Sequence, residues 1–309
     1  MQIGQANALS STSRATTPLP SLPLPPTTLG TIAPLATTAA RMLASPAAPS
    51  SQDPAELRAH ALLAQDVYND TAAPPAGYRV ASEAELRELN LDPSVLQAGD
   101  FRARVYAEGS GDDTRYVIAM RGTRFESLAD WTTNAQQAFG AESAHYRAAL
   151  LIGERIGRSE LADQVSFTGH SLGGGLASAA AIAGGRPADT FNASGLHDAT
   201  IAQADAIRAT NGTATPASVQ AWYVDGEILS GIQDGGDRVI GGVLGGILTG
   251  GPGGAAAGAV LLDLPEAYGT RHEMEAVAPE GLNWFERNLS PMLPIDRHSM
   301  DWVLSSLPR

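Results

Sequence analysis

Residues 165–174 read VSFTGHSLGG and decide the fold that we expect. An apolar strand over 165–168 leads into a turn that matches the pattern G-x-S-x-G, and a helix of small residues follows over 173–185. On such a strand-to-helix turn the serine is held in a strained conformation, which only small neighbours allow. The turn projects the hydroxyl group of Ser171 out of the sheet, and the N-terminus of the helix stabilises negative charge that develops beside it. These residues therefore predict an α/β-hydrolase with Ser171 as its nucleophile.

Strands and helices alternate along the rest of the chain. The turn over 109–113 joins two strands and predicts a hairpin. Strands that alternate with helices predict a mostly parallel sheet flanked by helices on both faces, so the expected class is α/β. We expect helices over 54–68, 128–157 (with a break near Gly140) and 199–210, and strands over 101–109, 115–122, 164–169, 188–194 and 218–224.

A second interpretation of the same turn is a nucleotide-binding loop. Residues 168–175 also fit the pattern T-G-x-x-x-G-x-G of short-chain dehydrogenases. Those enzymes use a Tyr-x-x-x-Lys pair, and this chain contains no lysine. Their loop follows the first strand of the fold, whereas here at least two strands come earlier, and no acidic residue ends the next strand to bind a ribose. The sequence therefore favours the nucleophile over the dehydrogenase.

Composition excludes several classes of function. The 309 residues carry a formal net charge of −13, which argues against a nucleic-acid partner and gives no attraction to anionic lipid. Any membrane contact should therefore be apolar or local. The absence of cysteine excludes thiol nucleophiles, disulfides and cysteine-ligated metals. All 20 basic residues are arginine, which excludes a Walker A loop, a pyridoxal Schiff base and a catalytic lysine.

The chain divides into two regions. Residues 1–52 are rich in Pro, Ser, Thr and Ala and predict a disordered N-terminal segment, either an inert tail or a secretion segment that is not cleaved. They lack the basic start and apolar run of a cleaved signal peptide. We therefore expect a protein that is secreted or translocated without such a peptide, or alternatively a cytoplasmic one. Residues 53–309 form the predicted hydrolase domain, with an insertion over 239–262.

A wider set of motifs resembles the class 3 lipase family, which includes the fungal triacylglycerol lipases. GHSLGGGLA at 169–177 carries the resemblance, together with Met120-Arg121-Gly122-Thr123 and the tryptophan of 130–131. The similarity extends from about Tyr116 to the C-terminus.

The resemblance implies an oxyanion hole built from Thr123 and from the backbone N–H of Leu172. Two donors that converge on the carbonyl oxygen as it becomes negative contribute about 3–4 kcal/mol each. Thr123 also has an alternative interpretation as a helix-capping residue.

The triad acid follows the strand over 218–224. In the fungal lipases the matching strand is followed by a short N-D-I-V run whose aspartate is the acid. Superposing that run on Asp225-Gly226-Glu227-Ile228-Leu229 assigns the role to Glu227. Asp225 is the alternative, because it lies nearer the end of the strand and is the usual residue type.

The triad base is assigned among six histidines. His298 precedes a C-terminal helix, where the H-x-x-Y/W segment of the family places the base, and His272 is the alternative. His272 lies in a segment that resembles a family strand whose histidine is not catalytic. His170 lies inside the turn and points elsewhere. The remaining three precede the acid and break the order Ser, acid, His, so we expect packed or solvated roles for His60, His145 and His197.

Together these residues predict hydrolysis of carboxylic esters of lipids. His298 takes the proton of Ser171, the acid stabilises the imidazolium, and water clears the acyl-enzyme without metal or cofactor. Resemblance to bacterial lipase effectors, together with the glycine-rich tract over 239–262, favours a phospholipase (A-type cleavage) over a triacylglycerol lipase, and both stay open. It also implies a secreted antibacterial or host-directed toxin, whose partners would be a membrane surface and an immunity protein.

The glycine-rich tract over 239–262 has no charged residue and repeats glycine at every fourth position from Gly242 to Gly258. Such spacing lets apolar helices pack closely, but Pro252 and the glycines weaken a soluble helix. A flexible surface insertion, a lid or membrane-docking element, and a membrane span all stay open. Two alternative functions follow: a membrane-active toxin that acts through the tract, and a hydrolase of small soluble esters or thioesters.

Overall fold

The computed structural model describes residues 53–122, 144–227, 265–282 and 296–308, all within one structural unit, Pro46–Arg309. Four sequence-based expectations lie outside these residues and stay predictions. They concern the segment 1–52, Thr123, the helix break near Gly140 and the tract over 239–262.

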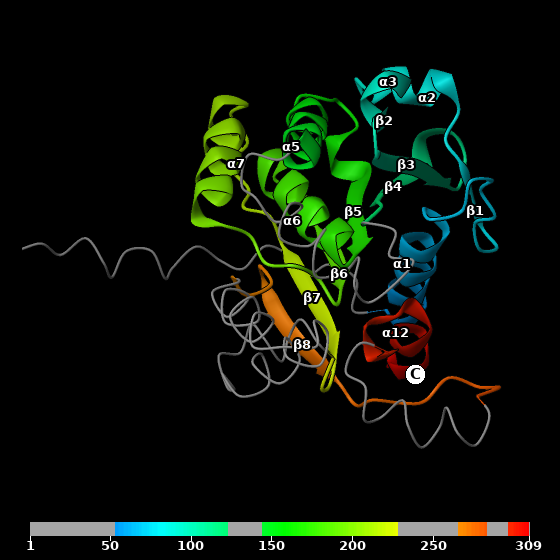
Figure 1. The fold of residues 1–309 in the computed structure, drawn as a ribbon. Coiled ribbons are helices and arrows are strands. Elements are labelled where there is room, and N and C mark those ends of the chain that lie inside the picture. The colour runs from blue at the N-terminus through cyan, green and yellow to red at the C-terminus, as the bar shows by residue number, and fades with distance from the viewer. Residues whose placement is uncertain (1–52, 123–143, 228–264, 283–295, 309) are drawn as a thin grey trace, which may run out of the picture. The chain divides into compact units, whose positions relative to one another are not determined.

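A single sheet of eight strands organises the described part of the chain, in the order β1-β3-β4-β5-β6-β7-β8, with β2 paired to β3 (Figure 1). β3 and β4 form the expected antiparallel hairpin, and the strands from β4 to β8 run parallel to one another. The prediction of a mostly parallel α/β sheet is therefore confirmed. The strands are β1 Tyr78–Val80, β2 Gln97–Ala98, β3 Phe101–Glu108, β4 Arg115–Met120, β5 Val165–His170, β6 Ala188–Phe191, β7 Val219–Val224 and β8 Thr270–Met274.

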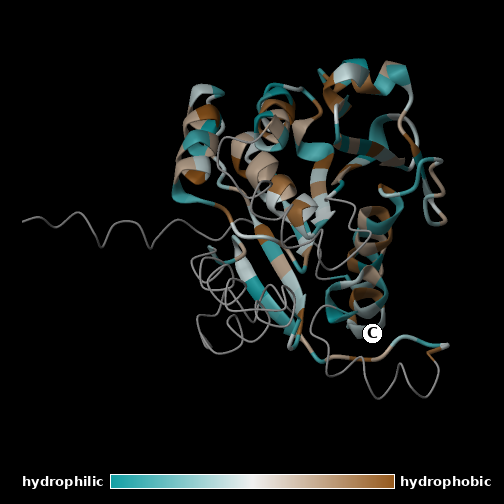
Figure 2. Ribbon diagram, viewed as in Figure 1, coloured by the Kyte–Doolittle hydropathy of each residue, from teal (hydrophilic) through white to brown (hydrophobic). Residues whose placement is uncertain are grey.

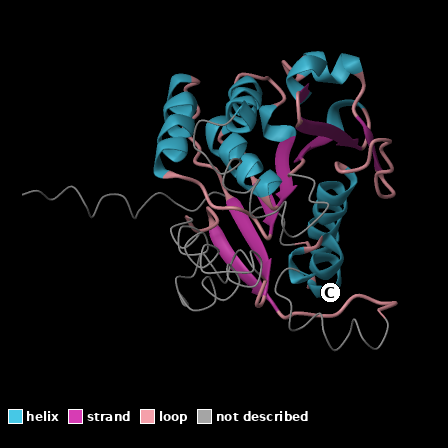
Figure 3. Cartoon of the chain, in the orientation of Figure 1, coloured by secondary structure: helices cyan, strands magenta, loops and turns pink. Residues whose placement is uncertain are grey.

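Helices cover both faces of the sheet (Figure 3). α1 and α12 lie on one face, and α5, α6 and α7 lie on the other. α6 is buried along its whole length and carries no strongly hydrophilic residue (Figure 2). None of the helices among the described residues is both long and apolar enough to cross a bilayer. The helices are α1 Pro54–Asp66, α2 Glu83–Glu88, α3 Pro93–Leu96, α5 Ala144–Gly157, α6 Leu172–Gly184, α7 Asp198–Thr210 and α12 Met300–Ser306, with 3₁₀ turns at Gly111–Asp113, Ala162–Gln164 and Asp296–His298.

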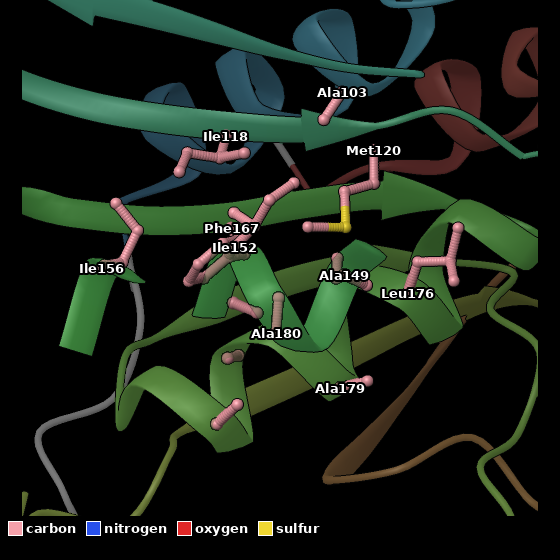
Figure 4. Close-up of a cluster of buried hydrophobic side chains, with 14 of the residues drawn as sticks. Ala103, Ile118, Met120, Ala149, Ile152, Ile156, Phe167, Leu176, Ala179 and Ala180 are labelled. Carbon is pink, nitrogen blue, oxygen red and sulfur yellow. The ribbon is translucent and has the colours of Figure 1, made fainter. Parts of the chain in front are cut away.

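The core is divided by the sheet, because successive residues of a strand point to opposite faces. Phe167 of β5 packs with Ile152 of α5 and Leu176 of α6 in the largest buried cluster (Figure 4). The next residue, Thr168, instead donates its hydroxyl to the backbone carbonyl of His60 in α1, at 3.2 Å. β5 therefore alternates apolar and polar residues over Val165-Ser166-Phe167-Thr168, although every residue of the strand except Ser166 is buried.

Several short elements are not expected from the sequence. β1, α2, α3 and β2 lie between the first helix and the hairpin. The two helices begin at local capping residues. Ser82 and Glu85 form a reciprocal capping box at the start of α2, and Asp92 caps α3. α1 ends at Asp66, two residues before the predicted end, and the strand predicted over 188–194 ends at Phe191.

Candidate active site

Ser171 lies between β5 and α6 with φ 58° and ψ −129°, a backbone conformation that is rare for residues with a side chain. Glycines make this turn possible. A methyl group on Gly169 would overlap the carbonyl oxygen of Gly173, and one on Gly173 would overlap that of Met120. The predicted strand–turn–helix geometry around Ser171 is therefore present, and it brings the end of β4 against the first turn of α6.

The backbone of Ser171 is fixed by hydrogen bonds to the neighbouring strand. Its N–H donates to the carbonyl of Phe191 at 3.1 Å, and its own carbonyl accepts from Ser194 N–H at 3.0 Å and Gly174 N–H at 2.9 Å. Ser171 is buried. The turn is therefore held on the β6 side as well as by its own helix.

The oxyanion residues of the prediction are described only in part. Leu172 is the first residue of α6, so its N–H belongs to the turn of a helix whose amides have no acceptor within the helix. Thr123 lies outside the described residues. The preceding residue, Gly122, packs beside the same turn, since a methyl group there would lie 3.2 Å from the backbone nitrogen of Gly173.

His298 and Glu227 are brought together by two turns that are distant in sequence. His298 ends the 3₁₀ turn Asp296–His298, and Glu227 follows β7. The Nδ1 atom of His298 lies 2.7 Å from Oε2 of Glu227, and both residues are buried, at 5% and 1% exposure. A buried carboxylate at this distance fixes the orientation of the imidazole ring.

The side chain of Asp225 is not part of this contact. Asp225 is exposed. Its backbone carbonyl accepts a hydrogen bond from the guanidinium of Arg297 at 2.7 Å, and its N–H donates to Met274. Of the two candidate acids, the structure thus brings Glu227 to His298.

His298 is also held through its backbone, close to the turn that carries Ser171. Its carbonyl oxygen accepts from Nε2 of His170 at 2.6 Å and from Nδ2 of Asn192 at 3.1 Å. The rings of His170 and His298 lie 4.8 Å apart between centroids. Because His170 immediately precedes Ser171, these bonds hold His298 next to the nucleophile turn.

His170 is neutral at physiological pH. Burial lowers its pKa to about 3, and repulsion from His298 acts in the same direction. A backbone carbonyl can only accept, so Nε2 carries the proton of His170. His170 therefore points toward the backbone of His298, and its ring is not placed as the base of Ser171.

The other candidate base, His272, is engaged within the sheet. It lies in β8 and stacks on Trp222, with 4.2 Å between ring centroids. Its Nε2 is 2.6 Å from Oε1 of Gln220. Of the packed and solvated roles that the sequence leaves open for His60, the structure shows a packed one, because His60 is buried.

A second set of Ser, His and Asp side chains lies between α1, which carries His60, and strands β5 and β6. Nδ1 of His60 is 2.7 Å from Oδ2 of Asp189, and Nε2 of His60 is 3.5 Å from the hydroxyl of Ser166. His60 and Asp189 are almost fully buried. Ser166 lies near the N-terminal end of β5, whereas ligands of open α/β sheets bind at the carboxyl ends of the strands. Ser166 therefore offers a control for Ser171, because it is a serine near a His-Asp pair at the opposite end of the same strand.

Two residues near the site are not identified by the sequence patterns. Asn192 follows β6 at the carboxyl edge of the sheet, and its position there is a signal that could have identified it. Tyr68, in the turn after α1, has no pattern of its own. Among the described residues, no group of three or more His, Asp or Glu side chains is placed to hold a metal ion.

Comparison with known proteins gives two matches. A family model described as Phospholipase-like, Tle-like phospholipase domain, matches residues 59–280. The chain is also 38% identical over 143 residues to an extracellular phospholipase A1 of Serratia liquefaciens. That match covers 46% of this chain and 43% of the relative, so the chain spans less than half of the relative's length. The range matched by the family contains Ser171 and Glu227, and His298 lies beyond it.

Proposed function

Because the chain belongs to the family of the Tle-like phospholipase domain, we propose that it hydrolyses an acyl ester bond of phospholipids with Ser171 as nucleophile. The observation that carries the proposal is the buried 2.7 Å contact between His298 and Glu227, held by His170 beside the turn of Ser171. Family membership makes the chain a carboxylic ester hydrolase by class. The substrate and the roles of individual residues belong to the proposal.

The proton of the serine passes to His298. Glu227, as a carboxylate, accepts the Nδ1–H of His298. The lone pair of the neutral imidazole is then on Nε2, which is the atom that can take a proton from a serine hydroxyl. Ser171 Oγ attacks the acyl carbonyl as the proton moves to Nε2, and the carboxylate of Glu227 stabilises the imidazolium that forms.

The negative oxygen of the tetrahedral intermediate is bound at the N-terminus of α6. The backbone N–H of Leu172 is the first donor, and we extend to Thr123 the second role that the resemblance to class 3 lipases implies. Collapse of the intermediate releases the lysophospholipid alcohol, which takes the proton from His298. Water then attacks the acyl-enzyme with His298 as base, and the fatty acid leaves.

The sn-1 ester is the proposed bond, because the Serratia relative is named a phospholipase A1. That relative is also named extracellular, which supports secretion of this chain. A role as an antibacterial or host-directed effector with an immunity protein, and membrane contact through the tract over 239–262, remain proposals of the same kind.

Vesicles of phosphatidylcholine with different acyl chains at sn-1 and sn-2 test the proposal. The expected products of the wild type are the sn-1 fatty acid and the 2-acyl lysolipid, measured by mass spectrometry. Ser171→Ala should lose this activity by about 10³-fold or more. The matched control is Ser166→Ala, which removes a hydroxyl from the other Ser-His-Asp set and should retain it.

Three outcomes would contradict the proposal. Release of fatty acid by Ser171→Ala at the wild-type rate would remove Ser171 from the chemistry. Vesicle leakage that survives Ser171→Ala without ester cleavage would favour a membrane-active toxin. Hydrolysis of a short-chain soluble ester with no cleavage of vesicle lipid would favour a small-ester hydrolase.

A further inference from the structure

Tyr68 connects two parts of the site that are distant in sequence. Its hydroxyl oxygen accepts the N–H of Gly122, at the end of β4, at 3.1 Å. The same hydroxyl lies 3.4 Å from the backbone carbonyl of His170 and 3.5 Å from its Nδ1 atom. One side chain therefore contacts both the segment that leads to Thr123 and the residue before Ser171.

The turn that carries Tyr68 is itself fixed. Burial alone would raise the pKa of Asp66, but hydrogen bonds from Tyr106, Ala73 and Asn69 outweigh burial and lower it. The hydroxyl of Tyr106 donates to Oδ2 at 2.7 Å, and the N–H of Ala73 donates to Oδ1 at 2.8 Å. Asp66 thus stays ionised and ties the C-terminal end of α1 to β3 and to the following loop.

The hydroxyl of Tyr68 keeps its proton across the working pH range. Burial raises the pKa of Tyr68 to about 12, although the bond from Gly122 and the charge of Arg121 oppose the shift. A protonated hydroxyl accepts from Gly122 and at the same time donates its proton. Within the described part of the chain, the acceptors in reach are the carbonyl oxygen and the unprotonated Nδ1 of His170.

His170 links Tyr68 to His298. Its Nε2–H donates to the carbonyl of His298 at 2.6 Å, which leaves Nδ1 as the acceptor that faces Tyr68. A continuous set of contacts therefore runs from Gly122 through Tyr68 and His170 to the backbone of His298. It joins Gly122, the last described residue before Thr123, and the proposed base to the same turn.

We propose that Tyr68 and His170 are positioning residues that set the end of β4 at Gly122 and the backbone of His298 together relative to Ser171. The inference rests on the proposed function, since it explains how Ser171 and His298, which that function requires, are held in position. The proposal gives neither residue a contact with the substrate. Their loss therefore lowers kcat while KM for a small ester stays unchanged, because misplacement of reacting groups by about 1 Å costs about a hundredfold in rate.

The test uses the full chain and p-nitrophenyl butyrate, a soluble ester that does not require a membrane. Tyr68→Phe should lower kcat by about ten- to a hundredfold at unchanged KM. The matched control is Tyr116→Phe at the start of β4, which removes the hydroxyl of another buried tyrosine, beside Glu85 of α2, and should retain wild-type kcat. Equal kcat for wild type and Tyr68→Phe overturns the proposal.

A double-variant cycle separates a shared role from two structural ones. If Tyr68 and His170 act as one unit, Tyr68→Phe combined with His170→Leu loses no more activity than the more affected single variant. Losses that multiply overturn the proposal. Should Tyr68→Phe not fold, His170→Gln replaces it: its amide can donate to the carbonyl of His298, so it should retain more activity than His170→Leu.

The failure of the proposed function gives a different result. A wild-type protein whose turnover of the ester does not depend on Ser171 overturns the proposed function and the positioning role together. Turnover that depends on Ser171 and is insensitive to both Tyr68→Phe and His170→Leu overturns the positioning role alone.

Discussion

The Nδ1 atom of His298 and the Oε2 atom of Glu227 are 2.7 Å apart in a part of the molecule with almost no solvent exposure. Asp225, two residues before Glu227, is exposed and contacts the loop of His298 only through its backbone. The glutamate is one methylene longer than the aspartate of the fungal lipases. That extra length suits a carboxylate that approaches from the third residue after β7 rather than from the first.

Replacement of each candidate acid by its amide tests whether Glu227 or Asp225 is the acid of the triad. Glu227→Gln should lower kcat by about 10³- to 10⁴-fold, because an amide no longer holds the tautomer of His298 or stabilises its charged form. Asp225→Asn should leave kcat near the wild-type value. Steady-state hydrolysis of a soluble ester measures both variants, and thermal unfolding checks that both are folded. The reverse ranking would assign the acid to Asp225.

Asn192 should act on His298 through the backbone. Asn192→Asp keeps the acceptor for Val224 N–H but replaces the amide that donates to the carbonyls of Arg297 and His298. We expect a fall in kcat of about ten- to a hundredfold with little change in KM. Asn211→Asp makes the same change where an amide donates to the carbonyl of Glu154, and it should leave kcat unchanged. Equal effects of the two variants on kcat would contradict a role of Asn192 at the site.

The free energy of unfolding should decrease as the pH falls below about 6, because His170 is buried in its neutral form. Its pKa is about 3 in the folded protein, against an ordinary value of 6.5, so between these values only the unfolded chain binds the proton. The unfolded state is therefore favoured as the pH falls, by about 1.4 kcal/mol for each pH unit below about 6. Urea unfolding at pH 7, 5 and 4 measures the effect. His170→Gln should show a shallower loss than the wild type, and an identical loss would contradict it.

The buried pair of His60 and Asp189 should contribute to stability rather than to catalysis. His60→Ala leaves the carboxylate of Asp189 without its buried partner, which costs roughly 3–5 kcal/mol in the free energy of unfolding. Differential scanning calorimetry should show a lower Tm, while kcat of the folded protein at low temperature stays near wild type. Loss of kcat without loss of stability would instead make this set a second reaction centre.

Much of the fold could be predicted from local patterns. The hairpin, the nucleophile turn and the alternation downstream of it follow from apolar runs, glycines and helical periodicity. The short elements β1 and β2 could not, because their strand conformation depends on pairing with β3, as in Tyr78 opposite Glu108 and Ala98 opposite Phe101. Strands of two or three residues carry too little pattern to identify alone.

The residues of the site that could be predicted are those whose side chains take part in the proposed reaction. Ser171, His298 and Glu227 are identified by motif and by resemblance, although their roles stay predictions. Asn192 and Tyr68 could not be identified in this way because they bind backbone groups. Every residue type has these groups, so the sequence of the partner segment does not indicate the contact. The amide of Asn192 reaches a carbonyl 106 positions later, and the hydroxyl of Tyr68 accepts from an N–H 54 positions later.

Covalent labelling of the nucleophile tests the central claim most directly. A fluorophosphonate reacts with an activated serine and forms a stable adduct, which peptide mass spectrometry assigns to one residue. We expect a single adduct at Ser171, formed in the wild type and in Ser166→Ala, and strongly slowed in His298→Ala. An adduct at Ser166, or ester hydrolysis by a protein whose Ser171 stays unlabelled, would contradict the assignment of Ser171 as the nucleophile.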